Sequence, residues 1–501
     1  MMKPSGVLCA AAGPLLLSTG LAFAQEFDLP PVLEGDSVVA APVIEDEGPA
    51  ADVGVASPEP DDIPLPDIAV GEIPPIEDSV EAEVTEAETS PPVLASKTSS
   101  LELELRGFRN EDQQGDDIYA GRFSAHWFGR NSLSENTALL FNLRARAAKI
   151  EAEPFEVEDD TRLDVQELGF AWDTGKNLSL EAGRINIRNG VALGFNPTDW
   201  FKANSLVTID SQDPGDRREE RLGTVVVNGA TSIGNTLVQA GYRPEISAAQ
   251  DTVITNADIV GLNLNRTNPS YAAYAKVSPG FGGNISFTGN VIVEDDRWGG
   301  GAEVSGALGN NLVLYGETFI QDRMNLSAEA LEDGSGSAAF RRGIGADQGF
   351  FVAAQLAVGA TWSFPEVLAK SEDISLSLEY HYNGAGLNNR ELDALADASG
   401  SDLAAAGAVH SFASREQEPL AQHQLFARFA WNDFWNDADF TAIGYYVPHD
   451  HSGLAQIAAS YPFNDNLELS MRAFSVFGSD TSVYGSNPLQ NSIQLAVKYT
   501  F

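Results

Sequence analysis

The sequence predicts an all-β fold, a transmembrane antiparallel β-barrel of about 18 strands (16–18), preceded by a disordered acidic and proline-rich segment. Three observations predict this fold. Apolar and polar side chains alternate through residues 99–501, most alternating segments have about the 9–11 residues that a tilted strand needs to cross a bilayer, and the last segment ends in an aromatic residue.

Residues 1–24 are predicted to be a secretory signal peptide. Lys3 precedes an apolar stretch that ends at the small-x-small site Ala22-Phe23-Ala24, so cleavage is expected before Gln25. A lipoprotein site at Cys9 is the alternative, but the apolar region ahead of it is too short. Cys9 is the only cysteine of the sequence. After cleavage we therefore expect no disulfide, no thiolate metal site and no cysteine nucleophile.

Residues 25–98 are predicted to be a disordered periplasmic tether. Positions 25–96 hold 19 acidic residues, 12 of the 25 prolines and no Lys or Arg. Like charges repel and proline removes backbone donors, so burial cannot offset the entropy of ordering this segment. Two roles stay open, a passive spacer and a docking arm for a basic periplasmic partner. The net charge of −42 excludes nucleic acid as a partner, because a polyanion requires a basic surface.

Residues 99–501 carry the pattern of strands. In residues 374–383, apolar or aromatic side chains occupy the even positions from Ile374 to Tyr382, and polar side chains occupy the odd positions from Ser375 to Asn383. One face therefore suits hydrocarbon and the other suits water. No run of 18 apolar residues follows the predicted signal peptide, so the sequence predicts no transmembrane helix there. The same criterion predicts strands at 101–108, 119–129, 138–148, 163–172, 178–188, 222–229, 236–243, 270–278, 284–294, 298–308, 312–322, 349–364, 374–383, 422–431, 439–447, 454–463, 467–477 and 492–501.

The connections between these strands alternate in length. Those after even strands are mostly short, and the long ones all follow odd strands: 189–221, 244–269, 323–348, 384–421 and 478–491. Outer-membrane barrels have short periplasmic turns and long outer loops, so both ends of the barrel are expected on the periplasmic side. Five tryptophans are expected to form an interfacial girdle on that side: Trp127, Trp172, Trp362, Trp431 and Trp435.

The C-terminal residues are an assembly signal by resemblance. Apolar side chains alternate with polar ones from Ile493 onward, and the chain ends with Tyr499, Thr500 and Phe501. This pattern resembles the terminal strand of Gram-negative outer-membrane proteins. The resemblance implies that the barrel-assembly machinery recognises Tyr499 and Phe501 and inserts the chain among outer-membrane lipids.

An eighteen-stranded barrel is too wide for side chains to fill, so its loops must set the pore size. The loop 189–221 is the candidate constriction, although a solvated surface loop is the alternative. Its candidate residues are Asp199, Asp213, Asp216, Arg217, Arg218, Glu219 and Arg221. Strand parity gives a hypothetical set of pore-lining residues: Arg122, Arg144, Arg146, Arg184, Arg188, Arg243, Arg428, Arg472 and Glu379.

Two features bear on that set. The parity of the strand 178–188 shifts near Gly183, which suggests a bulge. Lumenal arginines would guide anions, but the barrel segment itself carries 53 acidic residues against 28 Lys or Arg. Because these two fields oppose each other, the ion selectivity stays open.

A second resemblance concerns the candidate constriction. The stretch Gly183 to Gly190, followed by Asn196-Pro197-Thr198-Asp199, is similar to a region of porin-like outer-membrane proteins that include the alginate-export type. The resemblance covers residues 100–501 in architecture and only a short stretch in motif. It implies an eighteen-stranded channel through which an anionic polysaccharide leaves the cell.

The sequence therefore predicts a porin-like outer-membrane channel that passes small solutes or exports a polysaccharide. The alternatives are a loop-plugged barrel that acts as a surface adhesin or envelope anchor and, with less support, an outer-membrane hydrolase. We expect no enzyme activity, no catalytic residues, no metal and no cofactor. The motif His449-Asp450-His451 has metal-binding side chains but reads as part of a solvated outer loop.

Overall fold

A computed structural model describes residues 98–501 apart from 153–155, 176, 209, 249, 251–259, 282, 366–372 and 436. All of them belong to one of the chain's two units, because the other unit, Ala24–Val84, lies outside the described residues. The predicted signal peptide and tether also lie outside them, except for Thr98, which begins the first strand.

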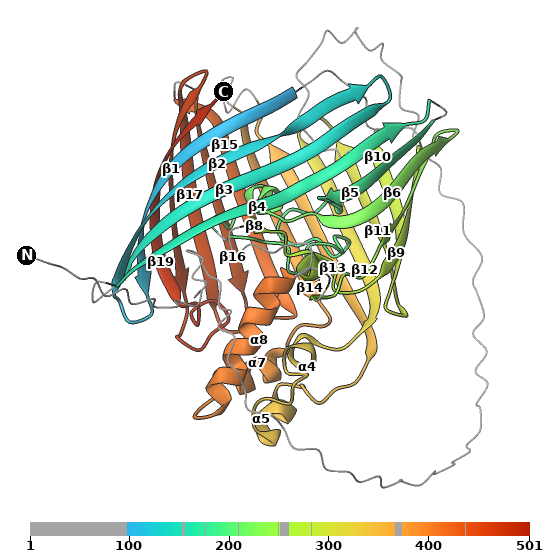
Figure 1. Cartoon of the computed structure of the whole chain (residues 1–501). Helices are drawn as coiled ribbons and strands as arrows, with labels where there is room; N and C mark the ends of the chain where they lie inside the picture. Colours follow the sequence, from blue (N-terminus) through green and yellow to red (C-terminus); the bar gives the residue numbers. More distant parts are fainter. Residues whose placement is uncertain are drawn as a thin grey trace, which may run out of the picture. The chain divides into compact units, whose positions relative to one another are not determined.

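The described residues form a closed antiparallel wall of eighteen strands (Figure 1). Each strand pairs with its neighbour along the chain, β7 pairs with β9, and β1 closes the ring by pairing with β19. Because the ring is closed, no strand lies at a free edge of the sheet along its whole length, as a bilayer requires. The wall strands are β1 (Thr98–Asp112), β2 (Asp117–Ser134), β3 (Thr137–Ala152), β4 (Glu156–Asp173), β5 (Leu178–Ile185), β6 (Thr224–Ile233), β7 (Thr236–Arg243), β9 (Ala272–Pro279), β10 (Ile285–Glu294), β11 (Arg297–Leu308), β12 (Leu312–Arg323), β13 (Phe351–Ser363), β14 (Asp373–Asn383), β15 (His423–Trp435), β16 (Ala438–Val447), β17 (Ser452–Asn464), β18 (Leu467–Phe477) and β19 (Leu489–Thr500).

A nineteenth strand lies outside this ring. β8 (Val260–Gly261) pairs in parallel with β4 at Leu163 and Asp164. At this height β5 has already ended, because it pairs with β4 only from Leu168 onward. The connection after β7 therefore supplies a short strand where the wall is incomplete.

The predicted barrel is confirmed, and each of the eighteen predicted segments corresponds to one wall strand. The largest differences are in β4, which begins at Glu156 instead of near 163, and in β2, which continues to Ser134 instead of ending near 129. The residues after Phe128 are mostly polar, yet their backbones continue to pair with β3, with a register shift between Ser132 and Ser134. The placement of Trp127 at a strand end is therefore wrong, whereas Trp172 and Trp362 are the penultimate residues of β4 and β13 and are largely exposed.

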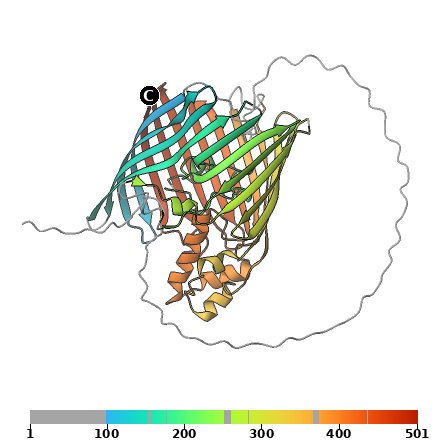
Figure 2. The ribbon, with the colours of Figure 1, turned by 45° about the vertical axis from the view of Figure 1, so that its right-hand side comes forward.

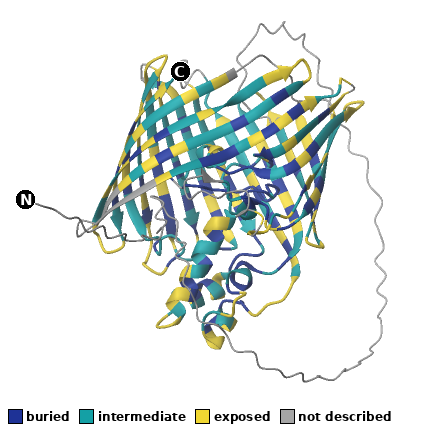
Figure 3. Ribbon diagram, in the orientation of Figure 1, coloured by how far each residue is buried: buried dark blue, intermediate teal, exposed yellow. Residues whose placement is uncertain are grey.

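The alternation of side chains produces two different surfaces. In β14 the outward Leu378 is 53% exposed, whereas the inward Glu379 is 4% exposed and the inward His381 is fully buried. Figure 3 shows exposed and covered residues alternating along the strands, with buried residues gathered in the lumen. The outer surface is therefore apolar and suits contact with lipid.

Two long connections form a helical structure that the sequence reading did not anticipate. It contains α4 (Leu326–Ala330), α5 (Ala338–Gly343), α7 (Asn389–Ala396) and α8 (Asp402–Glu416). We call residues 324–350 and 384–422 the cap. Figures 1 and 2 show the cap helices beyond the end of the barrel opposite to the C-terminus. Their common apolar core includes Leu326, Leu331, Ile344 and Val409, all with no exposed surface.

The sequence contains a signal for one of these helices. Asn388 and Glu391 form a capping box at the start of α7, and Leu392 and Leu395 are buried on one face of that helix. The prediction of plain loops at 323–348 and 384–421 is therefore wrong in this respect. No helix in the described part of the chain is long and apolar enough to cross a membrane.

Candidate functional site: a lumenal cavity beside a fold-back loop

The connection between β5 and β6 lies inside the barrel. We call residues 186–223 the fold-back loop; it includes the short helix α1 (Pro214–Glu219). Its first half contacts β12 and β14, where Val191 donates its backbone N–H to Glu317. Its second half contacts the opposite wall, where Asp210 pairs with Arg122 of β2. The loop therefore crosses the lumen.

Apolar and aromatic side chains fill the lumen under the first half of the loop. Phe201 and Trp200 pack with Tyr274 of β9 and Phe319 of β12, and Phe195 packs beside them against Tyr315. A second short helix, α3 (Leu264–Thr267), adds buried residues on the β6 side. Buried aromatic side chains therefore pack this half of the loop against the wall.

The second half of the loop is held by ion pairs with the opposite wall. Asp213 accepts from Arg428 of β15 at 3.0 Å, and Asp216 accepts from Arg472 of β18 at 2.6 Å. Glu220 pairs with both Arg144 and Arg146 of β3. The loop acids thus meet the arginines that parity predicted to face the lumen.

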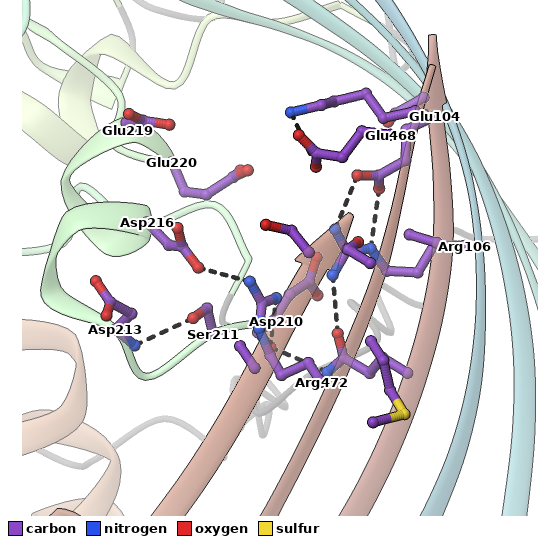
Figure 4. Close-up of a pocket in the computed structure, with 18 of the residues that line it drawn as sticks. Glu104, Arg106, Asp210, Ser211, Asp213, Asp216, Glu219, Glu220, Glu468 and Arg472 are labelled. Atoms are coloured by element: carbon purple, nitrogen blue, oxygen red, sulfur yellow. Dashed lines mark hydrogen bonds and ion pairs between the residues drawn. The ribbon is translucent and has the colours of Figure 1, made fainter. Parts of the chain in front are cut away.

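A cavity of about 330 Å³ lies between this half of the loop and the wall. Residues of β1 to β3 and β15 to β19 form its wall side, and residues 208–220 form its loop side. Figure 4 shows Asp213, Asp216, Glu219 and Glu220 on the loop side, with Glu468 and Arg472 across from them. Lining positions such as Glu468 and Lys498 lie close to the short turns, so the cavity extends from the middle of the barrel toward that end.

Most cations of the cavity lie on its wall side, which also carries Glu102, Glu104, Asp439 and Glu468, and five acids lie on its loop side together with Arg217. Its wall cations are Arg106, Arg122, Arg144, Arg428, Arg472 and Lys498, and its loop acids are Asp210, Asp213, Asp216, Glu219 and Glu220. Each of these wall cations has a carboxylate partner; for Arg106 and Lys498 the partners are Glu104 at 2.8 Å and Glu468 at 3.3 Å on the wall itself. Burial alone would raise the pKa of Asp210, but Arg122 and the neighbouring arginines lower it to about 2. The carboxylate of Asp210 therefore stays ionised beside Arg122.

The predicted site residues divide into two groups. Eight of them line the cavity: Arg122, Arg144, Arg428, Arg472, Asp213, Asp216, Arg217 and Glu219. Three more make contacts within the fold-back loop instead. Asp199 and Arg221 form a buried ion pair, and Arg218 donates to the Ala192 carbonyl at 3.0 Å. Asp210 and Glu220, which make the central ion pairs, belong to the same charged run of the sequence but were not among the predicted residues.

The remaining predicted residues lie away from the cavity. Arg146 is buried between Asp164 and Glu220, and Arg243 pairs with Glu294. Arg188 is exposed beyond the end of β5. Glu379 is buried under the first half of the fold-back loop.

The expected bulge at Gly183 is not present in the pairing of β5. Its register with β4 and β6 is continuous, and Arg184 donates to the Gly223 carbonyl at 2.9 Å. A register shift is present instead in a neighbouring strand pair, between β3 and β4 after Asn142. The close approach of the β4 and β5 backbones explains why position 183 is a glycine, because a Cβ there would lie 2.5 Å from the Leu168 carbonyl oxygen.

The His449-Asp450-His451 motif does not converge on one point. His449 contacts Asp393 at 2.8 Å, His451 contacts the Tyr446 hydroxyl at 2.8 Å, and Asp450 accepts from Ser452. Among the described residues, no three His, Cys, Asp or Glu side chains gather where they could hold a metal ion.

No protein-family model matches this chain, and neither does any curated protein. Solved structures of Pseudomonas aeruginosa proteins are similar to it in fold. OpdQ is 10% identical over 80% of this chain and 98% of its own, with a TM-score of 0.46. OpdK is 10% identical over 81% and 99%, with a TM-score of 0.43, and the outer membrane protein OprD is 12% identical over 80% and 93%, with a TM-score of 0.42. Such distant likenesses assign neither a function nor residue roles to this chain.

Proposed function

We propose that this chain is an outer-membrane channel for small polar solutes, which pass beside the fold-back loop through the 330 Å³ cavity. One observation carries the proposal: a closed barrel with an apolar exterior contains a charged cavity that a loop narrows from one side. A lumen narrowed by a loop and lined by charged groups is how wide barrels select what they pass.

The location follows from the chemistry of the barrel surface. Each wall strand pairs with both of its neighbours in the ring, and the outward side chains are largely apolar. Aromatic residues are exposed near both ends of the strands, including Trp172 and Phe463 at the short turns and Tyr119 and Trp298 at the other end. Two such rims suit the two interfaces of a membrane.

Small solutes are the proposed cargo because half of the lumen is filled. Aromatic packing under the first half of the fold-back loop restricts the passage to the side of β1 to β3 and β15 to β19. Nothing in this arrangement favours export of a polysaccharide. Since the wall cations already have carboxylate partners, a passing anion must compete with the loop acids, so we expect no strong preference for anions.

One observation favours a second candidate, a plugged barrel that serves as an adhesin or anchor. The fold-back loop reaches the opposite wall, where the Gln494 side chain donates to the Asp210 carbonyl at 3.0 Å and the Gln456 side chain accepts from the Gln212 N–H at 2.8 Å. A loop held on both sides would obstruct the lumen if it did not move.

Swelling of proteoliposomes separates the two candidates. Vesicles that contain the folded protein are diluted into isotonic solutions of a monosaccharide, a neutral amino acid, a disaccharide and a large dextran. A channel of the proposed kind predicts swelling in the monosaccharide and the amino acid, slower swelling in the disaccharide and none in the dextran. Absence of swelling in all four, from vesicles whose protein is shown to be folded by heat-dependent migration, would contradict the channel and favour the plugged barrel.

A further inference from the structure

We infer that Glu317 and Glu379 are positioning residues that hold the first half of the fold-back loop against the wall and so set the width of the passage. The expected effect on solute passage rests on the proposed channel function. The expected effect on the position of the fold-back loop does not. Both carboxylates lie on wall strands, β12 and β14, on the side of the lumen away from the cavity.

Glu379 binds two consecutive backbone amides of the loop. Leu193 donates its N–H to Oε1 at 2.6 Å, and Gly194 donates its N–H to Oε2 at 2.8 Å. The carboxylate is itself fixed from the wall, because the Tyr315 hydroxyl donates to Oε1 at 2.8 Å and His381 Nε2 lies 2.8 Å from Oε2. Four polar groups therefore converge on one side chain that is 4% exposed. Charge-assisted hydrogen bonds of this kind are the strong ones.

Glu317 makes a second attachment three residues earlier in the loop. Its Oε2 accepts the Val191 N–H at 2.8 Å, with the Ala192 N–H at 3.5 Å and the Thr198 hydroxyl at 3.4 Å. The preceding residue, Gly190, has φ +91°, and a Cβ there would lie 2.6 Å from Glu317 Oε2. A glycine is thus required for the backbone to approach this carboxylate.

Neither carboxylate serves the roles that an acid in a pore usually has. Neither lines the cavity, and within the described residues neither forms an ion pair with a Lys or Arg. The loop acids that pair with wall arginines lie in the second half of the loop, from Asp210 to Glu220. What Glu317 and Glu379 have in common is that they accept backbone N–H groups of one segment, residues 191–194, which has no regular secondary structure to satisfy them.

The hydrogen bonds to Glu317 and Glu379 fix the first half of the fold-back loop. The charged second half continues from this fixed segment. If residues 191–194 were released, the loop would no longer restrain the position of α1 and its acids relative to β12 and β14. The ion pairs on the other side would then have to hold the whole loop alone. We therefore expect release to broaden the positions of α1 and to widen the passage.

The barrel contains a matched control for these two acids. Glu303 of β11 lies directly opposite Glu317 in the sheet and is 3% exposed. Its carboxylate accepts from the Asn290 side chain at 3.3 Å and makes no hydrogen bond with the fold-back loop among those of the described residues. Glu303→Gln removes a buried lumenal carboxylate beside Glu317 and at the same depth, but it removes no hydrogen-bond acceptor of the fold-back loop.

The experiment measures the position of the loop directly. No cysteine follows Cys9, so Glu219→Cys on α1 and Asn136→Cys in the turn after β2 provide two unique sites for nitroxide labels. The distance distribution between the labels is recorded by pulsed electron paramagnetic resonance for the otherwise wild-type protein, for E317Q/E379Q, for E317A/E379A and for E303Q. Swelling rates with a disaccharide are measured on the same proteins without labels.

The inference predicts a narrow distribution in the wild type and E303Q, a broader one in E317Q/E379Q and the broadest in E317A/E379A, because glutamine keeps one acceptor oxygen and alanine keeps none. The disaccharide rate should rise in the same order. An unchanged distribution in the alanine variant, with its barrel intact by heat-dependent migration, would overturn the inference. A broadened distribution without any swelling, in the wild type or the variants, would support the anchor and contradict the channel function instead.

Discussion

At the scale of single residues, the lumen is organised by carboxylates in three different settings. Glu379 accepts backbone N–H groups, Asp216 accepts from a wall arginine beside the cavity, and Asp199 pairs with Arg221 inside the fold-back loop. Their sequence contexts do not distinguish them. The setting depends on which strand or loop lies opposite each acid, and this is a property of the closed barrel.

The pair of Asp199 and Arg221 joins the first half of the fold-back loop to the end of its second half. Both side chains are almost fully buried, and Arg221 also donates to Gln417 of the cap at 3.0 Å. Arg221→Leu would leave Asp199 as an uncompensated buried charge, at a cost of about 3–5 kcal/mol to the docked loop. We expect faster hydrogen exchange in residues 186–223, measured by mass spectrometry.

The control for this prediction is an exposed ion pair of the same chemistry. Arg109 and Asp117 are paired on the first hairpin, with side chains 51% and 36% exposed. Arg109→Leu should change exchange in the fold-back loop not at all and stability by about 0–1 kcal/mol. Equal effects of the two substitutions would contradict the structural role of the buried pair.

At the scale of elements, the cap is joined to the fold-back loop through the end of α8. The Asn204 N–H donates to the Arg415 carbonyl at 2.8 Å, and the Asn204 side chain donates to Glu416 at 3.1 Å. Gln417 follows with φ +55° and ends the helix. The cap and the loop therefore share a contact beyond the membrane-spanning strands.

This contact is expected to depend on pH. Burial and the nearby Glu418 raise the pKa of Glu416 to about 7, against the opposing effect of Arg323 and Arg415, with Glu329 a further acid nearby. A carboxyl whose pKa is raised on folding favours the folded state when protonated, so its contribution is full at low pH and is lost as the pH rises through about 7. Hydrogen exchange of α8, corrected for the intrinsic rate, should be slower at pH 6 than at pH 8.

Glu416→Gln is the test of that assignment. The glutamine stays neutral at both pH values, so the corrected exchange of α8 should lose most of its pH dependence. Burial lowers the pKa of His410 to about 4, and this histidine is present in both the wild type and the variant. Its contribution to the pH dependence is therefore the same in both proteins. An undiminished pH dependence in Glu416→Gln would assign the effect to another group.

The sequence was sufficient to predict the wall but not the contents of the lumen. Period-two alternation predicted all eighteen wall strands because each strand faces lipid on one side and polar groups on the other. It could not predict that Glu379 lies under a loop or that Asp210 meets Arg122, since these contacts join residues far apart in the chain. It also did not predict the cap helices, whose short amphipathic runs lie between strands and were read as loops.

At the scale of the whole molecule, the barrel closes through its last strand. β19 pairs with both β1 and β18, and the Phe501 N–H donates to the Leu101 carbonyl at 2.9 Å. The rings of Tyr499 and Phe501 lie 4.7 Å apart, and both residues are exposed on the outside. The aromatic end of the chain is therefore accessible, as its predicted role in assembly requires.

The central claim is that solutes pass through the cavity beside the fold-back loop. Glu219 lines this cavity and is exposed, and Glu219→Cys would carry the only thiol of a chain cleaved after residue 24. The most direct test is the single-channel current of Glu219→Cys in planar bilayers, before and after reaction with a bulky polyethylene glycol maleimide. We expect discrete current steps that are largely lost on labelling; current that persists unchanged after complete labelling, or no current from inserted protein, would contradict passage through this cavity.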